Sequence, residues 1–196
     1  MNKLLTLALL ALALGGCSSD SPLLEATIRV IVSTDASIGD DANAEINQVH
    51  ILVTRQGASS GFTHDYGLTD SAGPNETRVT LPNSLLLHNG HHFTDTGEII
   101  LTPINITVTA RKDTTDVIMR RAEDMVFDID KPVVLYMPLC KQCAEPTPLT
   151  QPCATDETCV SGSCQPAGVD LSLQPVDDGT QPAESSECPT PADAGP

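Results

Sequence analysis

Residues 57–61 read Gly-Ala-Ser-Ser-Gly and match the G-x-S-x-G pattern that surrounds the nucleophile of many serine hydrolases. In α/β-hydrolases this serine lies on a sharp turn between a strand and a helix, which exposes its hydroxyl for attack on an acyl group. A strand is predicted over residues 49–55, but residues 62–67 and the turn residues after them lack a helical pattern. We therefore interpret the motif as small residues that link two strands, and keep a surface-anchored hydrolase using Ser59 as an alternative.

Three of the five histidines fall within five residues, at His88, His91 and His92. Imidazole nitrogens at this density could hold zinc or copper. The Asn-Gly pair between them is instead typical of a β-turn, and metal sites usually draw their ligands from rigid elements. We expect no metal or other cofactor here, with a metalloenzyme as the alternative. Four further side chains could complete such a site: His64, Asp65, Asp95 and Glu98.

Three carboxylates, Asp35, Asp40 and Asp41, occupy a loop that also contains Ser37 and Asn43. Calcium binds loops rich in oxygen ligands, but the ligand order of an EF-hand is missing here. We interpret this segment as a solvated acidic loop.

Seven cysteines are present, and six of them lie in the carboxyl-terminal part of the chain: Cys140, Cys143, Cys153, Cys159, Cys164 and Cys188. Cys140 and Cys143 have the C-x-x-C spacing of redox dithiols and zinc knuckles. A redox dithiol needs a helix amino terminus that lowers a thiol pKa, and a zinc knuckle needs a second matched pair. An even number of cysteines in an exported chain instead indicates structural disulfides, whose pairing the sequence does not select.

The amino-terminal residues predict export of the chain. Lys3 is followed by an apolar run over residues 4–14 and then by two glycines before Cys17. Eleven helical residues rise about 16 Å, roughly half the thickness of a bilayer core, so this run is too short for a permanent membrane span. We expect residues 1–16 to be removed as a signal peptide.

Residues 14–17, Leu-Gly-Gly-Cys, resemble the lipobox of bacterial lipoproteins, in which the cysteine receives a diacylglycerol and becomes the new amino terminus. The resemblance implies lipid on Cys17, a tether over residues 17–24 and anchoring by acyl chains that contribute about 0.8 kcal/mol per buried methylene. Gly15 departs from the Ala, Ser or Thr more common in the family. Ser18, in place of Asp, implies the outer membrane. The alternative is an ordinary secretory signal with Cys17 in a disulfide.

The formal net charge of −16 argues against nucleic-acid binding and against an electrostatic grip on anionic lipid. Aromatic residues make up only 3% of the chain, and all five lie between residues 62 and 136. That interval is therefore expected to belong to the folded part of the protein.

Apolar and polar residues alternate with period two through most of residues 25–139, which predicts half-buried strands. The clearest case is residues 104–111, Ile-Asn-Ile-Thr-Val-Thr-Ala-Arg. Further strands are predicted over seven segments: 28–32, 49–55, 77–81, 85–87, 115–121, 124–129 and 133–137. We expect an all-β fold, namely an antiparallel β-sandwich of immunoglobulin-like or transthyretin-like topology.

After Leu139 the composition changes, since nine of the fifteen prolines lie beyond Cys140 and no aromatic residue follows. Such a segment buries too little apolar surface to offset its chain entropy, so any order must come from disulfides. We expect a small, largely irregular disulfide knot over residues 140–164 and a flexible, acidic, proline-rich tail over residues 165–196.

The lipobox, the β-rich domain and the C-x5-C-x-x-G-x-C spacing of residues 153–164 together resemble cysteine-rich surface lipoproteins of myxobacteria and their relatives. The resemblance implies an outer-surface location and a role in interactions, and it implies no catalytic residues. We expect a membrane-anchored, non-catalytic binding or structural protein of the cell envelope. Its partner would be an envelope protein, an extracellular protein or a glycan.

Overall fold

The computed structural model describes residues 26–58, 60–70, 77–89, 101–128, 131–144, 153–179 and 188. Within them the chain forms strands and two short 3-10 helices: β1 (Thr27–Thr34), β2 (Gln48–Arg55), β3 (Gly61–Gly67), β4 (Asn83–His88), β5 (Ile104–Lys112), β6 (Thr115–Met125), β7 (Val133–Leu139), η1 (Lys141–Cys143), β8 (Glu157–Val160), β9 (Ser163–Pro166) and η2 (Leu171–Leu173). The predicted all-β class is confirmed.

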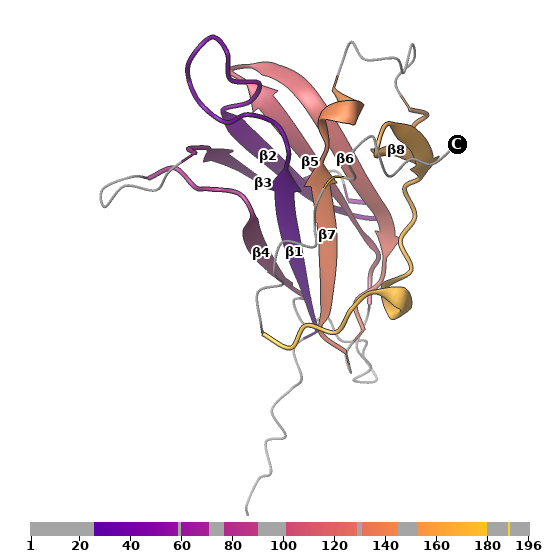
Figure 1. Ribbon diagram of the computed structural model, residues 1–196. Helices are drawn as coiled ribbons and strands as arrows, with labels where there is room; N and C mark the ends of the chain where they lie inside the picture. Colours follow the sequence, from indigo (N-terminus) through magenta and orange to yellow (C-terminus); the bar gives the residue numbers. More distant parts are fainter. Residues whose placement is uncertain are drawn as a thin grey trace, which may run out of the picture.

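Two sheets form the sandwich (Figure 1). One sheet has the order β4-β1-β7 and the other has the order β3-β2-β5-β6. An immunoglobulin constant domain instead keeps its first two strands together in one sheet. Because β1 and β2 lie in different sheets here, the immunoglobulin order is excluded, which leaves the transthyretin-like alternative.

One strand pair departs from the expected antiparallel arrangement. β1 and β7 pair in parallel, with Ile28 beside Val133 and Thr34 beside Leu139. Parallel neighbours need a long connection between them. The chain between β1 and β7 supplies it, because that stretch forms β4 and the whole second sheet.

The core lies between the two sheets and follows the predicted alternation. On β1 the side chains of Ile28, Val30 and Val32 are at most 3% exposed, and on β5 Ile106 and Val108 are fully buried. Burying a side chain of this size stabilises a fold by roughly 1.5–3 kcal/mol. The period-two pattern therefore identified the inward faces of β1 and β5 correctly.

Three elements differ from the predicted strand segments. β6 runs without interruption to Met125, where two strands were expected, because a register shift opposite Ile104–Ile106 accommodates the left-handed Asp124. The segment predicted as a strand over residues 77–81 contributes only a bridge between Val79 and Leu68. β3 was not among the predicted strand segments, although the interpretation of residues 57–61 as a link between two strands implied a strand after them.

The disulfide-rich segment contains a regular hairpin rather than only irregular chain. β8 and β9 pair antiparallel with Cys159 opposite Cys164. The two turn residues, Ser161 and Gly162, have φ angles of 49° and 79°, which is typical of the tight turns that join such strands. The hairpin docks on β6, where the Arg121 backbone N–H donates to Thr158 Oγ1 at 2.7 Å.

All six carboxyl-terminal cysteines form disulfides, as predicted. The pairs are Cys140–Cys188, Cys143–Cys159 and Cys153–Cys164. Their Cα atoms lie 5.4, 5.8 and 5.5 Å apart, within the usual range for such bridges. Two of the three bridges close the knot, and the first ties the end of β7 to residue 188.

Residues 167–179, here called the C-terminal strap, pack against the sandwich, which corrects the expectation of a flexible tail for this part of it (Figure 1). Ala167 and Leu171 are 1% and 5% exposed. The Glu123 N–H donates to the Ala167 carbonyl at 2.8 Å, so the strap pairs with the edge of β6. Composition alone did not predict this packing, because two buried side chains, Ala167 and Leu171, together with backbone hydrogen bonds are enough to hold the segment.

The strap then continues along the edge of β7. The Val134 N–H donates to the Pro175 carbonyl at 2.9 Å, and the Asp177 N–H donates to the Pro132 carbonyl at 2.9 Å. Arg29 Nε on β1 donates to Asp177 Oδ2 at 2.7 Å, and this carboxylate is 6% exposed. The strap therefore covers the β6 and β7 edges on one side of the sandwich.

Candidate binding site

Six of the residues singled out in the sequence lie outside the described residues: Cys17, Ser59, His91, His92, Asp95 and Glu98. The strand β3 begins two residues after Ser59, at a place where a nucleophile elbow requires a helix. His88 is the last residue of β4 and is exposed. Among the residues the structure describes, no group of three or more His, Cys, Asp or Glu side chains is arranged to hold a metal ion.

His64 and Asp65, considered as additional metal ligands, belong to opposite faces of β3. Successive strand residues alternate between faces, and His64 lies opposite the buried Ile51 whereas Asp65 lies opposite the exposed-face His50. The two side chains therefore do not converge on one site. His50 Nδ1 and Asp65 Oδ1 are 2.8 Å apart, and Arg111 also contacts this carboxylate at 3.3 Å.

Carboxylates of the acidic loop over residues 35–47 accept backbone hydrogen bonds, both from the loop itself and from η1. Asp35 Oδ1 accepts the backbone N–H of Lys141 at 2.7 Å. Asp41 Oδ1 accepts the backbone N–H groups of Asn43 and Ala44 at 2.7 and 3.0 Å. These carboxylate oxygens already have protein donors, so we interpret the loop as a structural element.

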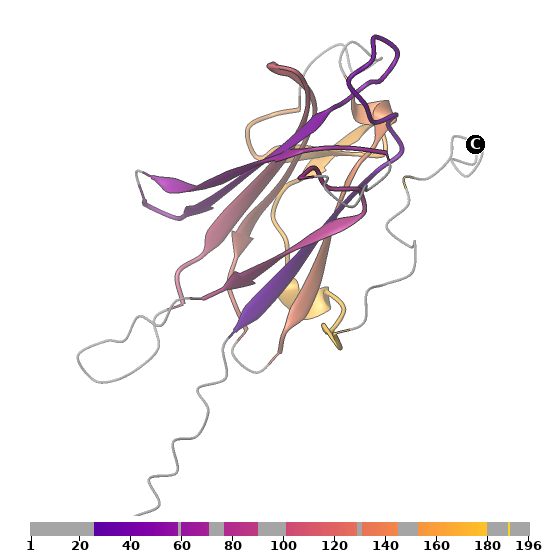
Figure 2. The same ribbon diagram turned by 90° about the vertical axis from the view of Figure 1, so that its left-hand side faces the viewer.

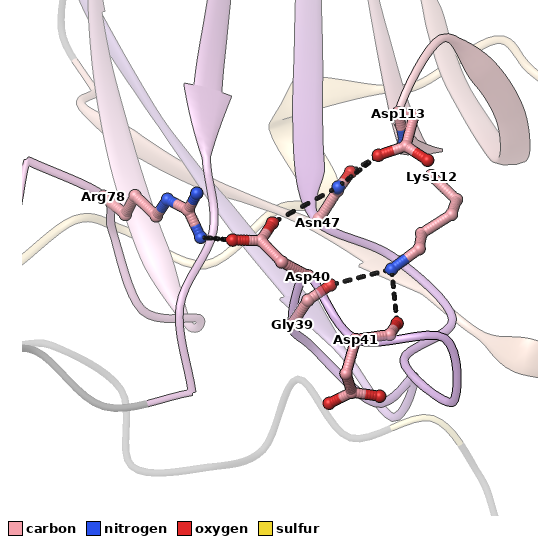
Figure 3. Close-up of polar contacts among 7 residues, drawn as sticks. All are labelled: Gly39, Asp40, Asp41, Asn47, Arg78, Lys112 and Asp113. Atoms are coloured by element: carbon pink, nitrogen blue, oxygen red, sulfur yellow. Dashed lines mark hydrogen bonds and ion pairs between the residues drawn. The ribbon is translucent and has the colours of Figure 1, made fainter.

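Figure 3 shows the polar network that holds this loop to the turn between β5 and β6. Asp40 forms an ion pair with Arg78 and also contacts Asn47. Asn47 Nδ2 donates to Asp113 Oδ1 at 2.8 Å, while Lys112 Nζ donates to the loop carbonyls of residues 39 and 41 at 3.0 and 2.8 Å. The network therefore links the two loops at one end of the sandwich.

We predict that the Asp40–Arg78 contact makes the fold sensitive to acid. The hydrogen bond from Arg78 lowers the pKa of Asp40 below its usual value of 3.8. Stability from this pair is thus present above pH 3.8 and is lost as the pH falls through the lower folded-state pKa. In urea titrations, Asp40→Asn should lower the unfolding midpoint at pH 7 and flatten its decline toward pH 2.

The matched control is Asp156→Asn, which neutralises an exposed carboxylate of the disulfide-rich segment. Its urea midpoint should keep the acid dependence of the parent chain. An Asp40→Asn variant whose midpoint falls with pH as steeply as the parent's would contradict a role for the Arg78 pair.

A different side of the sandwich carries an apolar pocket. β3 and β4 are the edge strands of the two sheets on the side opposite the strap, and Figure 2 turns this side toward the viewer. Between them lies a small pocket that is open to solvent, here called the β3–β4 pocket. Its lining residues are Val32, Val49, Ile51, Tyr66, Leu68, Val79, Leu81, Asn83, Ser84 and Leu85.

An aromatic row extends from the pocket along β3. Phe62, His64 and Tyr66 share the inward face of their sheet, because they lie opposite Val53, Ile51 and Val49 in register. Among the described residues the facing sheet has one strand fewer, and Phe62 is 52% exposed. The rings of His64 and Tyr66 are 4.3 Å apart, and those of Phe62 and His64 are 6.2 Å apart and stacked.

Sequence reasoning missed this aromatic row. The signal was the period-two spacing of residues 62, 64 and 66, which lies directly after the G-x-S-x-G pattern. Exposed apolar and aromatic side chains beside a preformed pocket are typical of binding surfaces. The row and the β3–β4 pocket together form the candidate binding site.

The fold and this surface define an all-β sandwich with an open, apolar edge, a disulfide-bonded hairpin and a strap along two sheet edges. No protein-family model matches the chain, and no similar curated protein or solved structure is found. In the described part of the chain, no helix is long and apolar enough to cross a membrane.

Proposed function

We propose that this chain is a membrane-anchored, non-catalytic binding protein of the bacterial cell envelope, held by lipid on Cys17. The lipobox at residues 14–17 supports the anchor, and Ser18 supports the outer membrane as its location. The observation that carries the binding role is the exposed aromatic row beside the β3–β4 pocket. Its partner would be an envelope protein, an extracellular protein or a glycan.

The alternative of a hydrolase or metalloenzyme rests on Ser59 or on the histidines His88, His91 and His92. A strand after the G-x-S-x-G motif favours a link between strands over a nucleophile elbow. Seven of the ten residues that line the pocket are aliphatic, and its polar groups are those of Tyr66, Asn83 and Ser84, which favours binding over acid–base chemistry.

The anchor is tested by intact-mass spectrometry of the protein extracted from membranes in detergent. We expect a mature chain that begins at Cys17 and carries added acyl mass. In Cys17→Ser this mass should be absent and the protein should leave the membrane fraction, because acyl chains supply the membrane affinity. The control Ser19→Ala keeps the modified cysteine and should behave as the parent chain.

An unlipidated parent chain with Cys17 in a disulfide would contradict the proposal and would indicate a freely secreted protein. Metal analysis of the same purified sample addresses the enzyme alternative. Zinc that survives dialysis at near-stoichiometric amounts would favour the metalloenzyme.

A further inference from the structure

The backbone of β3 directs unpaired groups toward solvent. The Leu68 N–H donates to the Asn47 carbonyl on the β2 side at 2.8 Å, while the Gly67 carbonyl accepts the Val79 N–H from the other side at 2.9 Å. Backbone groups alternate in direction along a strand. Thr63 and Asp65 therefore point their N–H and C=O groups away from β2, and no strand within the described ranges pairs with them.

This edge lacks the features that usually keep an edge strand from pairing. β3 contains no Pro and no Lys, and its register with β2 is unbroken from Gly61 to Gly67. Its one acidic residue, Asp65, is held on the outer face by His50 and Arg111. The β6 and β7 edges, by contrast, are paired with the strap.

The inner face of β3 determines which side chains an added strand would present to the protein. An added strand continues the pleat of the sheet, so every second side chain would lie beside the aromatic row and the β3–β4 pocket. Large apolar residues at alternate positions would fit this face. The formal net charge of −16 favours basic over acidic residues at the intervening positions of a partner, because it acts through the field of the whole chain.

We propose that β3 captures an extended polypeptide by strand addition, with Thr63 and Asp65 supplying the backbone hydrogen bonds. The partner segment has apolar side chains at alternate positions, which lie against the aromatic row beside the β3–β4 pocket, and basic side chains between them. This proposal rests on the proposed binding function and names its site and the chemistry of its partner. Strand addition of this kind is a recurring mode of peptide recognition.

A second copy of this chain fits the edge less well than a free peptide. Antiparallel pairing of β3 with its own copy about His64 would place residue 60 of that copy beside Leu68. That position is already occupied by Val79, which bridges to Leu68. A peptide that ends before this point avoids the collision.

The test uses the mature chain in detergent and a blocked heptapeptide of alternating lysine and valine as the probe. We expect binding, together with hydrogen-exchange protection of the Thr63 and Asp65 amides in the complex. Thr63→Pro removes the outward N–H at an edge position that tolerates proline and should weaken binding about tenfold or more. Thr115→Ala, at the exposed start of β6, leaves the β3 edge intact and should bind as the parent chain does.

Two further arms keep the outcome decisive if Thr63→Pro fails to fold. Phe62→Ala should also weaken binding, because it removes the most exposed ring of the row. A probe with N-methyl groups on alternate amides should not bind. Equal binding of the methylated and unmethylated probes, or no binding of either, would overturn strand addition.

Amide protection at Thr63 that rises with protein concentration in the absence of probe would overturn the peptide proposal in favour of a second copy. None of these outcomes depends on the lipid mass on Cys17. A lipidated chain that fails to bind the probe therefore overturns strand addition alone, while a binding chain without lipid overturns only the anchor.

Discussion

A chain that ends at Pro166 and carries Cys140→Ser should lose most of its folding stability and should self-associate. The deletion removes the bridge between Cys140 and Cys188, which closes a loop of 48 residues and is worth about 4 kcal/mol in the loop-entropy model. It also removes the buried Leu171, worth roughly 1.5–3 kcal/mol. Together these losses approach the whole stability of an ordinary domain, roughly 5–15 kcal/mol.

Self-association follows from the same deletion because the strap pairs with two sheet edges. Without it, the backbone groups of Glu123 on β6 and Val134 on β7 lose their partners in the strap. Edges exposed in this way are templates for pairing with other chains. Light scattering after size-exclusion chromatography and urea unfolding would measure the two effects.

The double variant Cys140→Ser/Cys188→Ser serves as the control, since it removes the bridge and keeps the strap. It should lose stability but stay in the same association state as the parent chain. A truncated chain that elutes as the parent does and keeps the parent urea midpoint would show that the strap neither protects the edges nor stabilises the sandwich.

Replacing Arg120 by methionine is expected to stabilise the protein by roughly 1–3 kcal/mol. Arg120 lies opposite the fully buried Val108, on the inward face of the edge strand β6. Its Nη1 atom is buried, and among the described residues it has no hydrogen-bond acceptor. Burial accordingly lowers the pKa of this guanidinium from its usual value.

We expect this stabilisation because the Arg120 Nη1 donor is buried without an acceptor among the described residues. A buried donor without an acceptor costs about 1–3 kcal/mol, whereas methionine fills a similar volume and needs no acceptor. The control is Arg121→Met, because Arg121 Nη1 donates to the Thr155 carbonyl at 3.1 Å and holds the knot to β6. In urea unfolding the first variant should be more stable than the parent and the second less stable. A destabilised Arg120→Met would mean that the guanidinium has an acceptor in solution.

The strands were predictable because their signal is local. In β1 and β5 the polarity of each side chain indicates the face on which it lies. The alternation at Ile28, Val30 and Val32, and at Ile106 and Val108, therefore identifies both the strand and its inward face. β3 was not among the predicted strand segments, because its inward face consists of Phe62, His64 and Tyr66, which remain exposed or half-buried. A strand that is not fully buried has a weaker apolar pattern.

The candidate site was not predictable for a related reason. Residues of β2, β3 and β4 line the pocket, and their proximity depends on which strands become edges of the two sheets. The motifs that drew attention in the sequence were instead short and local. Ser59 precedes a strand, and the carboxylates of Asp35 and Asp41 accept backbone hydrogens.

The sequence by itself determined the all-β class, the change of character after Leu139 and the presence of disulfides among six cysteines. These properties follow from composition and from the two-residue period of the strand, which any single segment displays. Only the tertiary structure decided the sheet order, the parallel pair of β1 and β7, the disulfide pairing and the packing of the C-terminal strap. Each of these joins residues far apart in the chain, and backbone hydrogen bonds between strands carry no side-chain signature that would name the partner.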